Sequence, residues 1–253
     1  MLVKDMVVRD IVAIDSGKDI IDALFVMFSN RRLVLPVFNG PHFAGTISMC
    51  GYAELLKDFR GKTPESIRVS QIMDKKIRTV SPTTDVLDVI DKVTERGVYS
   101  VPVLSGHNLI RMVTREDVMR QFLPLLRGRF NVGDVMSYDV SVGSIHDTVE
   151  SVVERIISGD EKRIVIMDYK KVEGIICIKD LVNVLLAEKS ELSDMSVKDI
   201  LVPNTITLRK SDDIAKAAEI ILDWWVGGVP VMDGELEGIV KDKDILQRLR
   251  FIM

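Results

Sequence analysis

The chain has 253 residues, of which 47% are hydrophobic and 28% are charged. This composition predicts a folded chain of one or two domains and excludes a disordered polymer. The formal net charge is −4, which argues against general binding to a nucleic-acid backbone. The charge is uneven, because residues 1–126 carry 17 basic and 15 acidic side chains and residues 127–253 carry 17 and 23. An anionic small ligand is therefore expected to prefer the first half.

The cysteine content and the hydropathy of the sequence predict the cellular compartment of the protein. Cys50 and Cys177 are the only cysteines, so a disulfide framework and a cysteine-rich zinc site are excluded, and a reducing cytoplasm is expected. Lys4 and Asp5 lie where a signal peptide needs apolar residues, so no export signal is expected. The uncharged stretch 33–53 contains an Asn-Gly-Pro-His sequence that predicts a turn between two strands rather than a membrane span.

Four similar blocks follow one another along the chain, at offsets of 66, 63 and 65 residues. Each block opens with a valine and a short apolar cluster, at Val3, Val69, Val132 and Val197. Apolar residues then recur at i, i+3, i+4 and i+7, which predicts one buried helix face per block. These stripes are Ile20/Ala23/Leu24/Met27, Val86/Val89/Ile90/Val93, Val149/Val152/Val153/Ile156 and Ile214/Ala217/Ala218/Ile221. The same offsets relate Pro36, Pro102, Val165 and Pro230, so the chain is predicted to be a fourfold repeat.

Within the second block the elements are predicted in a simple order. Thr79-Val80 forms a short strand, residues 84–97 a helix, residues 100–104 and 109–113 two strands around a turn, and a helix starts at Arg115. Blocks 3 and 4 are predicted to turn at 168–174 and 233–238, and residues 60–67, 127–131 and 188–194 are polar connectors. A unit of about 60 residues buries too little surface alone, so the blocks are expected to pack in pairs, sheet against sheet.

The turn from the last strand to the last helix carries the pattern Gly-apolar-x-Ser/Thr-x-x-Asp. Block 2 keeps both polar positions, as Thr114 and Asp117. Block 1 keeps Ser48 and has Gly51 in place of the acid, whereas blocks 3 and 4 keep the acid (Asp180, Asp244) and have Cys177 and Lys241 in place of the hydroxyl.

These recurring motifs resemble those of the cystathionine-β-synthase (CBS) domain family. The resemblance covers nearly the whole chain as four tandem repeats, at 1–58, 69–123, 132–187 and 197–250. In this respect the chain is similar to stand-alone CBS-domain proteins and to the gamma subunit of AMP-activated kinase. It implies an α/β (α+β) fold in which the repeats pair into two Bateman modules that form a pseudo-symmetric disc. It also implies clefts that commonly hold AMP, ADP, ATP or S-adenosylmethionine.

The resemblance implies one main ligand site at repeat 2. Asp117 would hold the ribose hydroxyls and Thr114 a phosphate, with Arg115 as the best phosphate partner. The expected adenine and ribose contacts are Ile77, Thr79, Tyr99, Val101 and Pro102. A weaker site at repeat 4 would use Thr205, Thr207, Val229, Pro230, Lys241 and Asp244. Further phosphate candidates are Arg31, Arg32, Arg96 and Arg163.

The chemistry of the motif leaves two interpretations open. A carboxylate accepts two hydrogen bonds and suits a ribose diol, and a hydroxyl at a helix start suits a phosphate. The same Thr-x-x-Asp spacing is also a helix-capping pattern. Lys241 is predicted either to meet a phosphate or to be solvated, and Cys177 is expected to be a small buried residue rather than a reactive thiol. For Trp224-Trp225, packing is favoured over stacking on a base.

Signals for catalysis are absent from the sequence. It has no phosphate-binding loop or dinucleotide fingerprint, and His42, His107 and His146 do not have metal-ligand spacing. The sequence therefore predicts a non-catalytic, cytoplasmic regulatory module without cofactor or metal. It would bind an adenosine-containing small molecule and act on a second copy or a partner protein, with no membrane or nucleic-acid partner. Two alternatives are a ligand-free structural or dimerisation module and an S-adenosylmethionine sensor.

Overall fold

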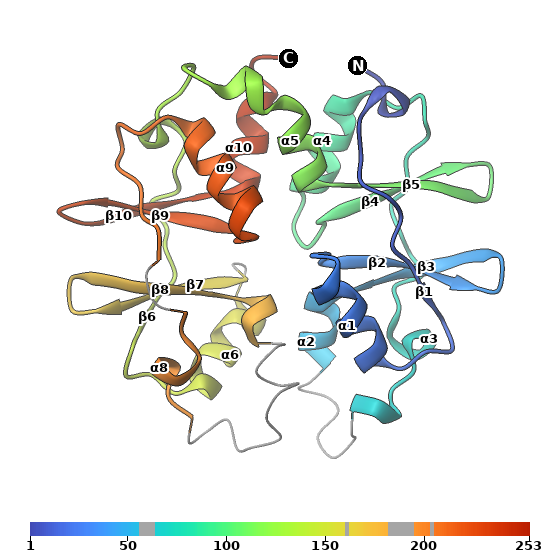
Figure 1. Cartoon of the computed structure of the whole chain (residues 1–253), viewed down its shortest axis with the longest axis horizontal. Helices are drawn as coiled ribbons and strands as arrows, with labels where there is room; N and C mark the ends of the chain where they lie inside the picture. The colour runs from blue at the N-terminus through green and yellow to red at the C-terminus, as the bar shows by residue number, and fades with distance from the viewer. Residues whose placement is uncertain (56–63, 160–161, 182–194, 203–204) are drawn as a thin grey trace. The chain divides into compact units, whose positions relative to one another are not determined.

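The computed structural model of the chain describes residues 1–55, 64–159, 162–181, 195–202 and 205–253. The chain divides into two compact units, Met1–Gln121 together with Met253, and Phe122–Ile252. Each unit contains two small sheets and their helices (Figure 1). Among the described residues, no helix combines the length and apolar content that crossing a bilayer requires.

The first unit repeats a strand–helix–strand–strand–helix order. Its elements are η1 (Val3–Asp5), β1 (Ile14–Asp15), α1 (Ile20–Ser29), β2 (Val34–Asn39), β3 (His42–Ser48), α2 (Met49–Leu55), η2 (Pro64–Ser66), α3 (Val69–Ile72), α4 (Val86–Thr94), β4 (Ser100–Ser105), β5 (Asn108–Thr114) and the start of α5 (Arg115–Leu126). The short first strand of repeat 2 is reduced to a parallel bridge between Val80 and Val103. The turn predicted within residues 33–53 is confirmed between β2 and β3.

The second unit follows the same order. After the end of α5 come η3 (Val132–Asp134), β6 (Val142–Ser144), α6 (Val149–Ser158), β7 (Arg163–Asp168), β8 (Lys171–Cys177), α8 (Val197–Ile200), α9 (Ile214–Trp224), β9 (Gly228–Asp233), β10 (Glu235–Lys241) and α10 (Asp242–Leu249). A parallel bridge between Leu208 and Val231 takes the place of the first strand of repeat 4.

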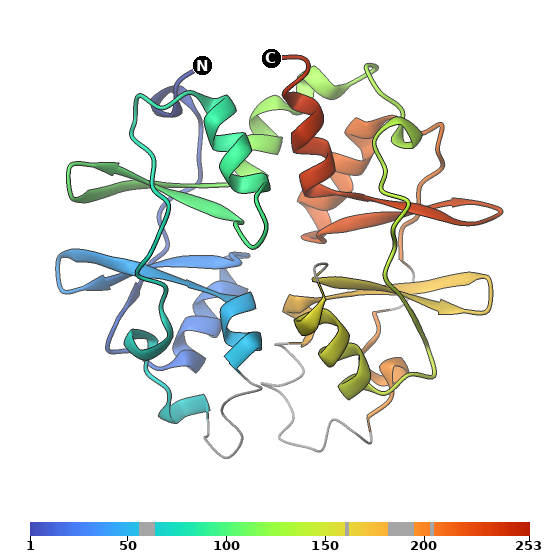
Figure 2. The ribbon, with the colours of Figure 1, turned by 180° about the vertical axis from the view of Figure 1, so that it is seen from behind.

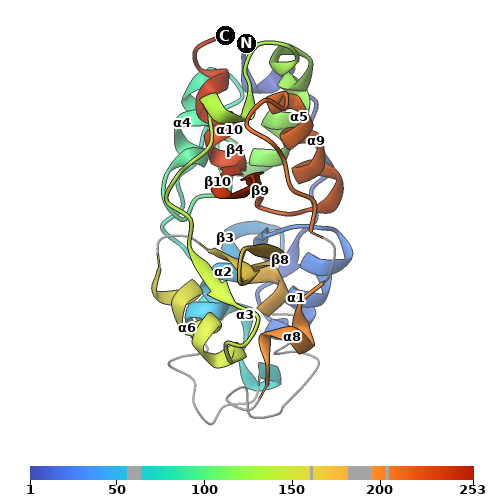
Figure 3. The same cartoon turned by 90° about the vertical axis from the view of Figure 1, so that its left-hand side faces the viewer.

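Within each unit the two antiparallel hairpins lie next to each other and the helices cover their outer sides. In the first unit β3 contacts β5, with α1 and α2 beyond one hairpin and α4 and α5 beyond the other (Figures 1 and 2). In the second unit β8 contacts β10, with α6 and α8 on one side and α9 and α10 on the other (Figure 3). This is the sheet-to-sheet pairing that the size of one repeat predicts.

The predicted helix stripes form the core. Ile20, Leu24 and Met27 of α1 are fully buried, and the stripes of α4 and α9 are buried in the same way. In α6 the stripe is buried except for Val153, which is half-buried. Asp19, Asp85 and Asp213 cap α1, α4 and α9 with side-chain hydrogen bonds, which explains why these helices begin where they do.

Three predicted boundaries were wrong. Helix α4 ends at Thr94 rather than near residue 97, because the backbone of Glu95 is already extended, with φ of −62° and ψ of 155°. The turns predicted at 168–174 and 233–238 are shorter, since β8 already begins at Lys171 and β10 at Glu235. Gly174 and Gly238, read as turn residues, lie within these strands. They face a chain segment packed so closely that a Cβ on Gly238 would lie 2.7 Å from the carbonyl oxygen of Ser137.

One hairpin carries a strained tip. Gly40, Gly106 and Gly234 have positive φ at the hairpin turns of repeats 1, 2 and 4, and Tyr169 occupies the same turn position in repeat 3 with φ of 52°. Tyr169 is also 95% exposed, so the ring gains almost no burial that would offset the strain.

Tyr169→Gly is therefore expected to stabilise the second unit by about 1 kcal/mol, because glycine adopts this backbone conformation without a Cβ clash. Chemical denaturation followed by tryptophan fluorescence measures this effect, since Trp224 and Trp225 both lie in the same unit. Tyr169→Ala is the control, because it removes the ring and keeps the strain. An equal gain for alanine would show that the ring, and not the backbone, is the cause.

Candidate functional site

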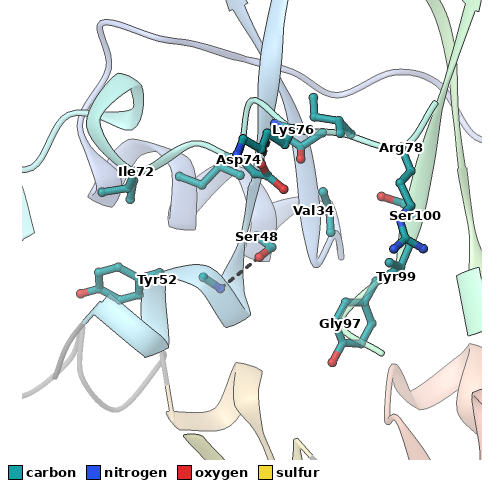
Figure 4. Close-up of a pocket in the computed structure, with 15 residues that line it drawn as sticks. Val34, Ser48, Tyr52, Ile72, Asp74, Lys76, Arg78, Gly97, Tyr99 and Ser100 are labelled. Atoms are coloured by element: carbon teal, nitrogen blue, oxygen red, sulfur yellow. Dashed lines mark hydrogen bonds between the residues drawn. The ribbon is translucent and has the colours of Figure 1, made fainter. Parts of the chain in front are cut away.

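The first unit contains a cavity of about 220 Å³ at the end of its repeat 1 motif. One wall comes from the end of β3 and the start of α2, with Thr46, Ser48 and Gly51, and another from the segment 74–78 that leads into repeat 2. Gly97, Tyr99 and Ser100 line the opposite side (Figure 4). The cavity is therefore built from both repeats of the unit.

A backbone bridge positions the leading segment of repeat 2 on the strand of repeat 1. Thr46 N donates to Asp74 O at 2.9 Å, and Asp74 N donates to Thr46 O at 2.8 Å. Gly45 makes this approach possible, because an added Cβ would lie 2.6 Å from the same Asp74 oxygen. The leading segment therefore places Lys76, Ile77 and Arg78 at the motif of the other repeat, not at its own.

Some polar groups of this cavity have partners within the protein and others do not. Ser48 Oγ accepts from Gly51 N at 3.0 Å and so caps α2, and Arg78 forms an ion pair with Glu95. The hydroxyls of Tyr52 and Ser100 are buried with no hydrogen-bond partner among the described residues. Burial raises the pKa of Tyr52 to about 12, and the nearby carboxylate of Glu65 adds to the rise. Both residues line the cavity, and because buried hydroxyls normally have a partner, each keeps an unused hydrogen-bond donor beneath the cavity wall.

The repeat 2 motif is closed within the protein itself. Asp117, 3% exposed, accepts on Oδ2 from Thr114 N at 3.0 Å and from Thr114 Oγ1 at 2.7 Å, and Asp117 N donates to Thr114 Oγ1 at 3.2 Å. Arg9 adds its Nε to Asp117 Oδ1 at 3.1 Å and its Nη2 to Thr114 Oγ1 at 3.1 Å. The pair thus caps α5 and binds an internal guanidinium, and the cavity beside it measures only about 10 Å³.

Arg115, predicted as a phosphate partner, binds backbone carbonyl groups of the protein itself. It is 5% exposed, donates from Nε to Val93 O at 2.6 Å and from Nη2 to Val98 O at 2.7 Å, and stacks over the ring of Tyr99. Its guanidinium therefore satisfies carbonyl groups that the end of α4 leaves without partners.

Arg111 explains why repeat 2 departs from the glycine of the motif. Its Nη1 donates to Lys4 O at 3.1 Å and Met6 O at 3.0 Å, with Val3 O at 3.4 Å. The side chain thus fixes the N-terminal segment that carries Arg9. The sequence missed both arginines as site residues, and the only signal for Arg111 was its departure from the repeat pattern.

The second unit contains a comparable cavity of about 230 Å³, at the motif of repeat 3. Asp180 and Lys179 lie at its polar end, and its walls are mostly aliphatic, with Trp224 at the rim. Asp180 accepts from Cys177 N at 2.8 Å and forms an ion pair with Lys179. Burial raises the pKa of the Cys177 thiol, and Asp180 adds to the rise, which fits a small buried residue rather than a reactive one.

The repeat 4 motif is closed in the manner of repeat 2. Asp244 accepts from Lys241 N and from Ser137 Oγ, both at 3.1 Å, and burial raises its pKa against the lowering effect of Lys241. Arg163 is also buried. It donates a hydrogen bond from Nη1 to Gly227 O and forms an ion pair with Asp242, in which Nη2 lies 3.7 Å from Oδ1. Lys241 is itself buried, so it is not a solvated side chain.

The predicted site residues are thus divided among several places. Ile77 and Tyr99 line the first cavity with Ser48, whereas Thr79 lies in a separate shallow cleft with Ser81 and Thr84. Thr205 and Val229 line the second cavity, and Thr207 is exposed outside it. Val101, Pro102 and Pro230 are buried in the hairpins and line neither cavity.

The grouping of these residues has one physical cause. The segment that leads into each repeat docks on the last strand of its partner repeat, so each motif meets residues of the other repeat. Val3 N donates to Thr84 O, and Val69 N donates to Lys18 O, which shows the same exchange at the helix starts. The prediction that Ile77 and Thr79 accompany Thr114 and Asp117 assumed that each repeat completes its own motif.

The fold and its clefts define a class of protein in which tandem repeats pair around inter-repeat cavities. The sequence matches the CBS domain family over residues 69–124, 132–187 and 197–250. The chain belongs to the CBS domain family. Among the described residues, no group of three or more His, Cys, Asp or Glu side chains is placed to hold a metal ion.

Known proteins resemble the chain over nearly its whole length. MJ1225 of Methanocaldococcus jannaschii is 23% identical over 94% of this chain and 95% of its own length. The crystal structure of MJ1225, described as a proposed archaeal homologue of g-AMPK, has a TM-score of 0.85 at 22% identity and covers 96% of this chain and 98% of its own. A conserved protein from Pyrococcus horikoshii has a TM-score of 0.68 at 15% identity, covering 98% and 100%. The shared fold therefore includes the first repeat.

Proposed function

We propose that the chain is a non-catalytic regulatory module that binds an adenosine-containing ligand, AMP, ADP or ATP, and passes its occupancy to a partner protein or to a second copy of the chain. Membership of the CBS domain family supports this proposal. The observation that carries it is the open cavity in each unit, placed at a strand-to-helix motif and completed by the leading segment of the partner repeat.

The two cavities differ in the chemistry that they offer. The first has the hydroxyl of Ser48, the cation Lys76 and Arg78 in its ion pair with Glu95, which suit a phosphate, but has Gly51 where a carboxylate would bind a ribose diol. The second keeps the carboxylate of Asp180 within mostly aliphatic walls. Both volumes are below the ~300 Å³ at which sites for drug-sized ligands begin, so a nucleotide would sit with its phosphates partly in solvent.

Thermal unfolding with added ligand tests this proposal. A ligand present at 100 times its dissociation constant is expected to add about 2.7 kcal/mol to the stability of the unit that binds it. AMP, ADP and ATP are expected to raise the unfolding midpoint, with GMP as the control for the base. Stabilisation by S-adenosylmethionine but by none of the three nucleotides would identify an S-adenosylmethionine sensor instead.

A second candidate function, a ligand-free structural module, is favoured by the closed motif of repeat 2. There the capping bonds of Thr114 and Asp117 and the ion pair with Arg9 use the polar atoms that a ligand would need. In that case no adenosine compound changes the unfolding midpoint of either unit.

A further inference from the structure

The two hairpins of the second unit end in tips that carry opposite charge. The strands β8 and β10 contact each other, and both tips project from the same side of the unit (Figures 1 and 2). The tip between β7 and β8, called the basic tip, exposes Lys170 and Lys171. The tip between β9 and β10, called the acidic tip, exposes Asp233 and Glu235. The two tips together form one edge of the unit, called the hairpin edge.

Most of these charges have no partner within the second unit. Lys171 pairs with Glu173 at 2.7 Å, whereas the side chain of Lys170 and the two carboxylates of the acidic tip form no hydrogen bond or ion pair among the described residues. The hairpin tips of the first unit, at 39–42 and 105–108, carry no lysine and no carboxylate. The opposite charges are thus confined to the tips of the hairpin edge, where they are available to another molecule.

The basic tip also carries an exposed aromatic ring on a strained backbone. Tyr169 is 95% exposed and has φ of 52°, at the turn position where the other three repeats have glycine. Strained backbone positions that persist are concentrated where a side chain has a function. Tyrosine is enriched among the residues that dominate binding in protein interfaces, because it combines a large apolar ring with a hydroxyl. The strain therefore favours a role for this ring in contact with another protein.

A second exposed tyrosine lies near the acidic tip. Tyr138 is 70% exposed. A hydrogen bond to Glu237 at 3.0 Å raises the pKa of Lys210, and Tyr138 and Asp233 add to the rise, so these groups lie around the same lysine. Each end of the hairpin edge thus has an exposed aromatic ring beside its charges.

We infer that the hairpin edge is an interface for a second copy of the chain, related to the first by a two-fold axis. A two-fold axis perpendicular to the line between the tips reverses their order in the second copy, so each basic tip meets an acidic tip and the same contact forms twice. Tyr169 then lies against the acidic tip of the second copy, where its hydroxyl can donate to a carboxylate. A polyanion such as a nucleic acid would be repelled by the acidic tip, so the pattern favours a protein surface that carries both signs.

This interface is separate from the two cavities, because none of the residues that line them belongs to either tip. The inference therefore goes beyond the proposed function and holds with or without a bound nucleotide. Four hairpin tips form a small contact, so we expect a weak, reversible dimer. Added salt is expected to weaken it further, because it screens the exposed charges that pair across the axis.

Sedimentation velocity of the ligand-free full chain, over a range of protein concentrations, measures the association. Wild type is expected to show a monomer–dimer equilibrium. Tyr169→Gly is expected to raise the dissociation constant by about 10-fold or more, without lowering the unfolding midpoint. Lys170→Glu/Lys171→Glu is expected to remain monomeric, because acidic tips then face each other at both contacts. His107→Glu is the matched control, since it adds negative charge to an exposed hairpin tip of the first unit, and it should associate as wild type does.

A mixture of two charge variants distinguishes this interface from a folding defect. Asp233→Lys/Glu235→Lys makes both tips basic, so alone it is expected to be monomeric. Mixed in equal amounts with Lys170→Glu/Lys171→Glu, it should form heterodimers, because every acidic tip then meets a basic one. Wild type that stays monomeric at every concentration, a dimer that none of these variants weakens, or a mixture that does not associate would overturn the inference.

Discussion

Asp117→Ala is expected to destabilise the first unit by about 3 kcal/mol, whatever ligand it binds. The substitution leaves the cap from Thr114 Oγ1 to Asp117 N in place, but it removes the reciprocal bond from Thr114 N and the other hydrogen bonds of the charged carboxylate, which contribute about 1.5–3 kcal/mol. It also leaves Arg9, which is partly exposed, without its closest carboxylate. A residue whose only role is to bind ligand would not change the stability of the ligand-free protein, whereas Asp117→Ala is expected to lower it.

Hydrogen exchange of the β4–β5 hairpin is the suitable measurement, since both tryptophans of the chain lie in the second unit and report on that unit instead. The double variant Arg9→Ala/Asp117→Ala is the control. If the ion pair matters, the double variant loses less than the sum of the two single losses. Unchanged exchange in Asp117→Ala would contradict the structural role of the carboxylate.

Gly51→Asp is expected to increase the affinity of the first cavity for a ribose-containing ligand by about 10- to 150-fold. The substitution adds a carboxylate at the position that Asp117 and Asp180 hold in other repeats, on the same wall of the cavity as Ser48. Gly51 lies in the first turn of α2, and an added Cβ would lie 3.3 Å from the hydroxyl of Ser48, a close contact that a small shift of this side chain relieves. An acidic residue is also favourable at a helix start.

Titration with adenosine and with its 2′,3′-dideoxy analogue measures this effect. The gain should appear only for adenosine, because the analogue has no diol for the new carboxylate to bind. Gly51→Ala is the control, since it brings the same gain in helix propensity without the charge. A gain of equal size for both compounds, or for Gly51→Ala, would show that the cavity does not place a ribose at this position.

The helices and hairpins could be predicted from the sequence because their signals are local. The apolar stripe of α4, the capping Asp85 and the hairpin around Gly106 each depend on residues a few positions apart. The strand-to-helix motif was located for the same reason, at Thr114 and Asp117. The exchange of leading segments could not be predicted in this way, because Arg9 lies 108 residues from Asp117. Nothing in the spacing of one repeat shows that its motif is completed by the other.

The same limit applies to individual site residues. Tyr99 was predicted as a cavity residue of repeat 2; it lines the first cavity with the motif of repeat 1, and it also lines the small cavity beside Thr114. Arg115 was chosen because it lies inside the motif, and its guanidinium instead binds carbonyl groups near the end of α4. A sequence pattern identifies where polar side chains occur, whereas their partners depend on which backbone groups the tertiary fold leaves unpaired.

The exchange of leading segments also constrains how the chain folds during synthesis. The segment from Val3 to Arg9 is translated about 80 to 110 residues before its partners Thr84, Arg111 and Asp117. At about 5–20 residues per second, repeat 1 must wait roughly 5 to 20 seconds before its N-terminal segment can dock. During this delay Val3 and Met6, which are buried in the finished unit, have no surface to cover them. Repeat 1 therefore cannot complete its packing until repeat 2 has been translated, and a single repeat released alone would be exposed to aggregation.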